Sequence, residues 1–211
     1  MMQEEFKTLI LRHAANEALA DQLWLQLQTA YTQPDRYFHN LSHLQQLIAA
    51  LQPLQVQAQD WDTLLFAVFY HDVVYDVVEY VTDNNNEDKS AEVAERALAS
   101  IGYPADKIER CKQHILATKK HLPSADNDTN LLTDADLSIL GQPWEAYDDY
   151  RKNIRKEYDI YPDGIFHAGR IKVLKQFLQA DRLYKTDLFH QQLELQAEKN
   201  LSRELELISL L

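Results

Sequence analysis

The spacing of the apolar residues is the feature that most constrains the fold of this sequence. In stretches such as 41–51 and 171–178, large apolar residues recur three and four positions apart, as on one face of an α-helix. No comparable alternation of apolar and polar residues predicts a β-sheet. Only four glycines and six prolines interrupt the chain, so the breaks between helices are local. We therefore predict an all-α fold.

Prolines, glycines and polar clusters set the expected helix boundaries. The segment TDNNNEDK is the polar break expected before the fourth helix. No linker or change of composition divides the 211 residues, and 45% of them are hydrophobic, so we expect a single domain over 1–211. The predicted helices span residues 3–31, 41–52, 60–78, 87–101, 105–119, 131–140, 144–158, 163–180 and 186–208.

Composition limits the classes of function. The formal net charge of −12, from 33 acidic and 21 basic residues, argues against a broad contact with a nucleic-acid backbone. The sequence shows no signal peptide and no apolar run of membrane-spanning length. Its single cysteine, Cys111, excludes an intramolecular disulfide. We expect a cytoplasmic protein with neither nucleic acid nor membrane as its partner.

Polar residues at the ends of apolar runs indicate where a site lies. The segment FYHDVVYD places His71 and Asp72 after a strongly apolar stretch, where an unpaired carboxylate would be costly to bury. The segment RYFHNLSHL places His39 and His43 four residues apart at the start of the second predicted helix. A bound cation would satisfy these groups.

The apolar segment LLTDADLSIL adds Asp134 and Asp136 to these candidates. Imidazole and carboxylate groups together suit a first-row divalent metal, and such a ligand set leaves room for water and substrate. Each residue alone also fits a structural role, for example a hydrogen-bonded core histidine or a helix cap at Asp134. Taken together, they favour a metal site.

The ordered residues resemble a known signature. His43, then His71 and Asp72, then Asp136 are similar to the H…HD…D pattern of the HD superfamily of helical metal-dependent phosphohydrolases. The resemblance covers about residues 31–185 and is closest to a subgroup of predicted HD phosphohydrolases. The segments that carry it are RYFHNLSHL, FYHDVVYD, NEDKSA, ILATKKH, DADLSILG and GRIKVLKQFL.

This resemblance implies an HD-type helical bundle with His43, His71, Asp72 and Asp136 as metal ligands. Asp136 is preferred to Asp134 because it follows alanine in an Ala-Asp-Xaa-Leu pattern. Asp134 then becomes a helix cap or an acceptor that supports a ligand. The expected cofactor is one divalent ion, which could be Mn, Fe, Co, Ni or Zn.

The implied function is hydrolysis of a phosphate ester in a small metabolite, with nucleotides as the leading class. Monoesters and diesters both stay open. Two other readings also stay open: a metal- or nucleotide-binding HD module without turnover, and an HD-fold oxygenase with two irons.

Two carboxylates are candidates for acid–base catalysis. Asp76 follows Asp72 by one turn, and Glu87 opens the next predicted helix. Either could hold or deprotonate the attacking water, or protonate the leaving group. Both also fit structural roles at helix ends.

Substrate phosphate needs local cations in so acidic a chain. The candidates are Arg36 before the first histidine motif, and Lys119 and His121 in TKKH. His39 could contact substrate, orient a ligand or make a plain hydrogen bond at the helix start. His114 is assigned to packing or substrate rather than to a second metal.

Two structural expectations concern the C-terminal part of the chain. Gly169 is expected to permit close helix approach, and Arg170 to pair with an acid. The final amphipathic helix is expected to pack internally, and the oligomeric state stays open.

Overall fold

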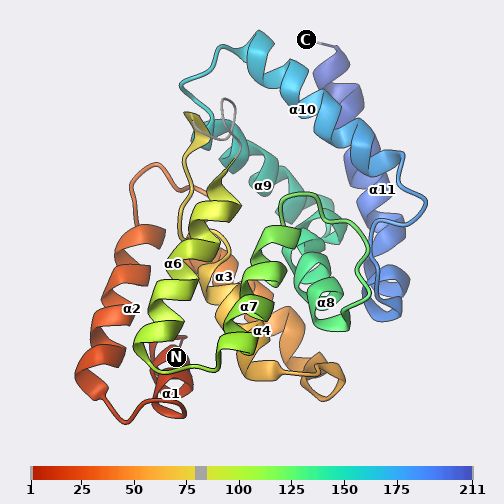
Figure 1. Cartoon of the computed structure of the whole chain (residues 1–211). Helices are drawn as coiled ribbons and strands as arrows, with labels where there is room; N and C mark the ends of the chain where they lie inside the picture. The colour runs from red at the N-terminus through yellow and green to blue at the C-terminus, as the bar shows by residue number, and fades with distance from the viewer. Residues whose placement is uncertain (1, 79–84, 211) are drawn as a thin grey trace. The chain divides into compact units, whose positions relative to one another are not determined.

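The computed structural model describes residues 2–78 and 85–210, and every regular element in those ranges is helical (Figure 1). The prediction of an all-α fold is confirmed. None of the helices in this part of the chain is both long enough and apolar enough to cross a membrane.

The chain divides into two compact units, Met1–Thr133 (unit 1) and Asp134–Leu211 (unit 2). The division falls within α8, Asn127–Asp136, and the expectation of a single domain stays a prediction. The other α-helices of unit 1 are α1 (Met2–Leu11), α2 (Glu17–Tyr31), α3 (Leu41–Leu51), α4 (Trp61–Tyr70), α6 (Asn86–Ser100) and α7 (Ala105–Ala117).

Helix α4 forms the centre of unit 1. Its residues from Thr63 to Tyr70 are all buried, because apolar side chains surround the helix axis on every side. It packs against α3, α6 and α7, while α6 and α7 lie side by side (Figure 1). Phe69 meets Phe6 of α1 edge to face, with ring centroids 4.9 Å apart. The helix that leads to His71 and Asp72 is therefore anchored in the core.

Two of the predicted helices are not continuous over their predicted ranges, and side chains bond the backbone where they are interrupted. The range predicted as 3–31 is broken between α1 and α2, where Asn16 caps α2 by accepting the Leu19 N–H at 3.0 Å. The helix predicted over 60–78 ends at Tyr70. After it, the carbonyl oxygens of Asp72 and Val73 accept hydrogen bonds from the Arg36 side chain.

Two other boundaries change the expected positions of site residues. Asn40 caps α3 by accepting the Ser42 N–H at 2.9 Å, so His39 precedes the helix that carries His43. Helix α8 begins at Asn127 rather than near 131, so Asp134 lies inside it and does not cap its start. The polar segment 82–89 includes residues 82–84, which lie outside the described ranges, while α6 already begins at Asn86.

Unit 2 contains α9 (Trp144–Glu157), α10 (Asp163–Leu178), α11 (Asp187–Ser209) and a 3₁₀ segment, Leu137–Gly141. Helix α11 packs along α10 and against the 3₁₀ segment (Figure 1). The internal packing expected for the final helix is thus observed within its unit.

The expectation for Arg170 is confirmed, and the one for Gly169 is wrong. The Arg170 guanidinium makes two hydrogen bonds of 2.9 Å to the buried Glu204 carboxylate, which also accepts from the Tyr147 hydroxyl. A Cβ on Gly169 would meet nothing within 4 Å among the described residues, so no helix in that part of the chain approaches it closely.

Candidate metal centre

Three of the predicted ligands converge in unit 1. His43 Nε2 lies 3.3 Å from His71 Nε2, and Asp72 Oδ2 lies 3.2 Å from His71 Nε2 and 3.8 Å from His43 Nε2. Both histidines are buried, and Asp72 is partly exposed. The group therefore has one side open to solvent through its carboxylate.

These separations fit a shared divalent ion. With metal–ligand bonds of about 2.1 Å, neighbouring ligand atoms in tetrahedral or octahedral spheres lie about 3.0–3.4 Å apart. The two shorter distances fall in that range, and the distance of 3.8 Å corresponds to a wider angle at the ion. The three residues form a group that could hold a metal ion.

The His71 ring is held in the orientation that a metal ligand requires. Its Nδ1 lies 2.9 Å from the Val68 carbonyl oxygen, one turn earlier. A carbonyl only accepts, so Nδ1 carries the hydrogen and the Nε2 lone pair faces His43. Without a metal, a hydrogen on His43 Nε2 can be donated to that lone pair across the 3.3 Å between the two nitrogens.

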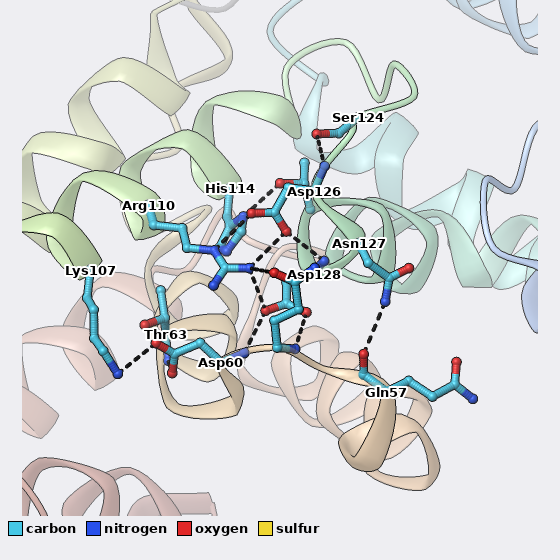
Figure 2. Close-up of polar contacts among 12 residues, drawn as sticks. Gln57, Asp60, Thr63, Lys107, Arg110, His114, Ser124, Asp126, Asn127 and Asp128 are labelled. Atoms are coloured by element: carbon cyan, nitrogen blue, oxygen red, sulfur yellow. Dashed lines mark hydrogen bonds and ion pairs between the residues drawn. The ribbon is translucent and has the colours of Figure 1, made fainter.

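A second group with metal-ligand chemistry lies elsewhere in unit 1. His114 of α7 lies near Asp126 and Asp128, as Figure 2 shows. His114 Nδ1 bonds the Thr129 hydroxyl at 2.8 Å, whereas its buried Nε2 has no hydrogen-bond partner among the described residues.

The carboxylates of this second group are already engaged. Arg110 makes ion pairs of 2.8 Å to Asp126 and 3.1 Å to Asp128, and Asp128 also accepts the N–H groups of Gln59 and Asp60 (Figure 2). A dication here would meet the arginine charge and lose these bonds. The existing contacts of the second group therefore explain its burial without a metal, and the metal ligation expected for the first group stays a prediction.

Glu87 is the better placed of the two acid–base candidates. It lies in the first turn of α6, is 9% exposed, and its buried Oε2 has no hydrogen-bond partner among the described residues. Burial raises the pKa of Glu87, and the nearby negative charge of Asp72 acts in the same direction. An unpartnered buried carboxylate oxygen near a candidate ligand is a group that a bound ion, water or substrate would satisfy.

Asp76 has a different environment. It is exposed, and its Oδ1 accepts the Val78 N–H at 2.8 Å, which closes a local turn after the His-Asp pair. Its backbone bonds the Asn86 side chain through both its N–H and its carbonyl. Asp76 thus joins this turn to the start of α6.

Arg36 and His39 both lie beside the candidate centre. The buried Arg36 guanidinium contacts the backbone that follows His71. The His39 ring stacks on Tyr75 with centroids 4.2 Å apart, and its centroid lies 5.6 Å from that of His43. The hydrogen bonds of Arg36 among the described residues are all to protein oxygens, and its predicted contact with substrate phosphate stays a prediction.

Lys119 and His121 both follow α7, which ends at Ala117, so Lys119 lies outside the helix that the sequence predicts over 105–119. Lys119 makes an ion pair of 2.9 Å with Asp88 and lines a cavity of about 760 Å³ formed by α7 and the segment after it. His121 has a left-handed backbone, φ 51°, and its N–H donates to the Ala117 carbonyl. Their proposed contact with substrate stays a prediction.

The two aspartates of DADL begin unit 2. Asp134 is fully buried, and its carboxylate accepts the N–H groups of Lys185 and Thr186 at 2.8 and 2.7 Å. Those residues immediately precede α11, so Asp134 anchors the start of that helix. This role explains the buried Asp134 without a metal, and the assignment of Asp136 as a ligand stays a prediction.

Sequence reasoning missed Tyr31 as a supporting residue. Its hydroxyl accepts the Asp72 N–H at 3.2 Å, which fixes the backbone of a candidate ligand. Tyr31 ends α2 at apolar spacing from Leu27, so the sequence pattern marks it only as a core residue. The partner lies 41 residues away, and no local signal predicts the pairing.

Comparisons with known proteins add no relative, since no family model, no curated protein and no solved structure matches the chain.

Proposed function

We propose that this chain is a metal-dependent phosphohydrolase of the HD superfamily. Its substrate is the phosphate ester of a small metabolite, with nucleotides as the leading class. The convergence of His43, His71 and Asp72 carries this proposal, because their ligand atoms lie at separations that suit one divalent ion. Asp136 joins them as a proposed ligand on the basis of the sequence resemblance alone.

A bound divalent ion would lower the pKa of a coordinated water and polarise a phosphoryl oxygen. The side chains of His43 and His71 would bind this ion through their Nε2 lone pairs. The Val68 carbonyl, by holding the Nδ1 hydrogen of His71, keeps that lone pair directed at the site.

Glu87 takes the role of proton carrier. Its unpartnered Oε2 can accept a proton from the attacking water and return it to the leaving oxygen. Burial favours the protonated form of this carboxyl, which suits a group that must return a proton. Lys119 and His121 are proposed to meet the substrate phosphate, in a protein that we place in the cytoplasm.

The test starts from protein purified without added metal. Metal content is measured, the protein is stripped, and each of Mn²⁺, Fe²⁺, Co²⁺, Ni²⁺ and Zn²⁺ is added back. Phosphate release is then screened over nucleoside monophosphates, polyphosphates and cyclic phosphates. We expect one tightly held metal per chain and metal-dependent release, both lost in Asp72→Ala while the helical signal persists.

A second His–Asp pair in unit 1 provides a matched control. His13 Nε2 lies 3.0 Å from Asp62 Oδ2, and within the described residues this pair belongs to no group of three possible ligands. Asp62→Ala should leave metal content and hydrolysis unchanged. Full metal occupancy in Asp72→Ala would refute the site. Tight metal binding without any turnover would favour the binding module, and two irons with oxygen consumption would favour the oxygenase.

A further inference from the structure

We propose that Arg36 is a positioning residue for the candidate metal centre, which acts by fixing the backbone of Asp72. This inference rests on the proposed metal site and assigns to Arg36 a role different from phosphate binding. Its basis is the set of atoms that the guanidinium contacts.

The guanidinium bonds three backbone carbonyls from two separate segments. Nη1 donates to the carbonyl oxygen of Asp72 at 2.7 Å and to that of His39 at 3.2 Å. Nη2 donates to the carbonyl oxygen of Val73 at 3.1 Å. One side chain thus joins the segment before α3, which carries His43, to the turn that carries His71 and Asp72.

The remaining contacts also fix the guanidinium in place. Nε donates to Gln33 Oε1 at 3.3 Å, and the guanidinium carbon lies 5.0 Å from the ring centre of Tyr31 and 5.5 Å from that of Tyr75. Arg36 is only 7% exposed. Within the described residues it pairs with no carboxylate, so carbonyl dipoles and aromatic faces compensate its charge.

This arrangement leaves little of Arg36 for substrate. A guanidinium has five N–H groups. Four hydrogen bonds to protein oxygens already use the N–H groups of Nε, Nη1 and Nη2. Binding a phosphate through both arms would break the bonds to Asp72 and Val73. The fork geometry instead suits two adjacent carbonyls, and lysine cannot reproduce it with one ammonium.

Asp72 is consequently held at both ends of its backbone. Tyr31 accepts its N–H, and Arg36 binds its carbonyl oxygen. These bonds replace the helical hydrogen bonds that end with α4, and they set the direction in which the carboxylate leaves the chain. Residues that orient metal ligands in this way typically change metal affinity about 10–100-fold when they are removed.

The test uses the full-length protein with Co²⁺ as the probe, because its visible absorption reports the geometry of the ligands. Co²⁺ affinity and spectrum are compared in the parent, Arg36→Met and Arg36→Lys. We expect about 10–100-fold weaker binding and an altered band in Arg36→Met. Arg36→Lys should recover little of the lost Co²⁺ affinity, because lysine restores the positive charge but not the two nitrogens that bond adjacent carbonyls.

Arg110→Met is the matched control, since Arg110 also bridges two segments of unit 1 but lies in the second acidic group. It should lose stability without any change in Co²⁺ affinity or spectrum. If Arg36→Met does not fold, the milder Arg36→Lys variant decides the result.

Two outcomes would overturn the inference. Unchanged Co²⁺ affinity and spectrum in a folded Arg36 variant would show that the metal centre does not depend on this side chain. Weaker binding of inorganic phosphate, with Co²⁺ binding unaffected, would return Arg36 to a substrate-contacting role. Co²⁺ binding that His43→Ala leaves unchanged would instead refute the metal centre itself, and the proposed function with it.

Discussion

Asp134 and Asp136 are two residues apart, and we predict different effects for their substitution. Asp136→Asn should cost far more metal affinity than Asp134→Asn, because only Asp136 is proposed as a ligand. The Asp134 carboxylate is used by the backbone before α11 and by Lys185, whose Nζ lies 3.5 Å away. Metal titration of both variants, followed by competition with a chelator, measures the difference.

Asp134→Asn should instead lower the free energy of unfolding by about 1–3 kcal/mol, since a buried charged acceptor is lost. Urea denaturation measures this cost, and Asp136→Asn serves as the comparison. The opposite order of metal affinities would transfer the ligand role to Asp134.

His114 predicts a dependence of stability on pH. Burial lowers its pKa below the ordinary value of about 6.5, and this effect exceeds the opposing effect of Asp126. Below the ordinary value the unfolded chain binds a proton that the folded chain does not, so stability falls as the pH drops through about 6.5. His114→Gln should reduce the loss of unfolding free energy between pH 7.5 and pH 5.5.

Urea denaturation at the two pH values measures that loss in the parent and the variant. His190→Gln is a suitable control, because His190 is more exposed and lies in unit 2. An equal pH dependence in the parent and in His114→Gln would contradict the prediction.

At the residue scale, the sequence predicts which residues are candidates for the site better than it predicts the partners that they bond. His43, His71 and Asp72 are polar residues set beside apolar runs, and that contrast is visible in one dimension. The partners of Arg36 lie 36 and 37 residues further along the chain, so its bonds depend on tertiary structure. The same holds for Asp128, which bonds backbone 68 and 69 residues away.

At the scale of elements, the sequence predicts the central parts of the helices but not the residues at which they end. The apolar faces of α3 and α7 follow helical spacing, and both helices lie where expected. Helix α4 ends eight residues before its predicted end at 78, because Arg36 and Ser90 bond the backbone that would have continued it. Local propensity cannot anticipate partners that arrive from other segments.

Gly141 allows a close approach between the 3₁₀ segment and α11 in unit 2. A Cβ at this position would lie 2.5 Å from Leu193 Cβ and 2.8 Å from the Leu193 carbonyl oxygen, which belong to α11. Gly141→Ala should therefore push α11 away from the 3₁₀ segment. The free energy of unfolding should fall by about 1–3 kcal/mol. Thermal or urea denaturation measures the loss.

Gly169→Ala is the matched comparison, since Gly169 lies inside α10 and no described atom lies within 4 Å of the added carbon. There the substitution should stabilise the protein by about 0.5–1 kcal/mol, because alanine favours the helix. Equal effects of the two substitutions would show that the contact with Leu193 does not limit the packing of α11.

At the scale of the whole molecule, composition and periodicity predict the fold class correctly. In a chain with a net charge of −12, cations such as Arg36 and Arg110 contribute through local hydrogen bonds and ion pairs. The division between Thr133 and Asp134 falls inside a continuous helix, without a glycine, a proline or a change in composition. No sequence signal of the kind that marks linkers accompanies it.

A bound divalent ion should raise the stability of unit 1. His43, His71 and Asp72 all belong to this unit, so an ion that binds them stabilises its folded state by mass action. At a free metal concentration of 100 times Kd, the free energy of unfolding should rise by about 2.7 kcal/mol. Trp24 and Trp61 lie in unit 1 and Trp144 in unit 2, so the emission of a Trp144→Phe variant reports unit 1 alone. Urea denaturation of this variant, with and without Co²⁺, measures the shift. Adding Asp72→Ala should abolish it, and an equal shift in that double variant would mean that the ion stabilises the protein from another site.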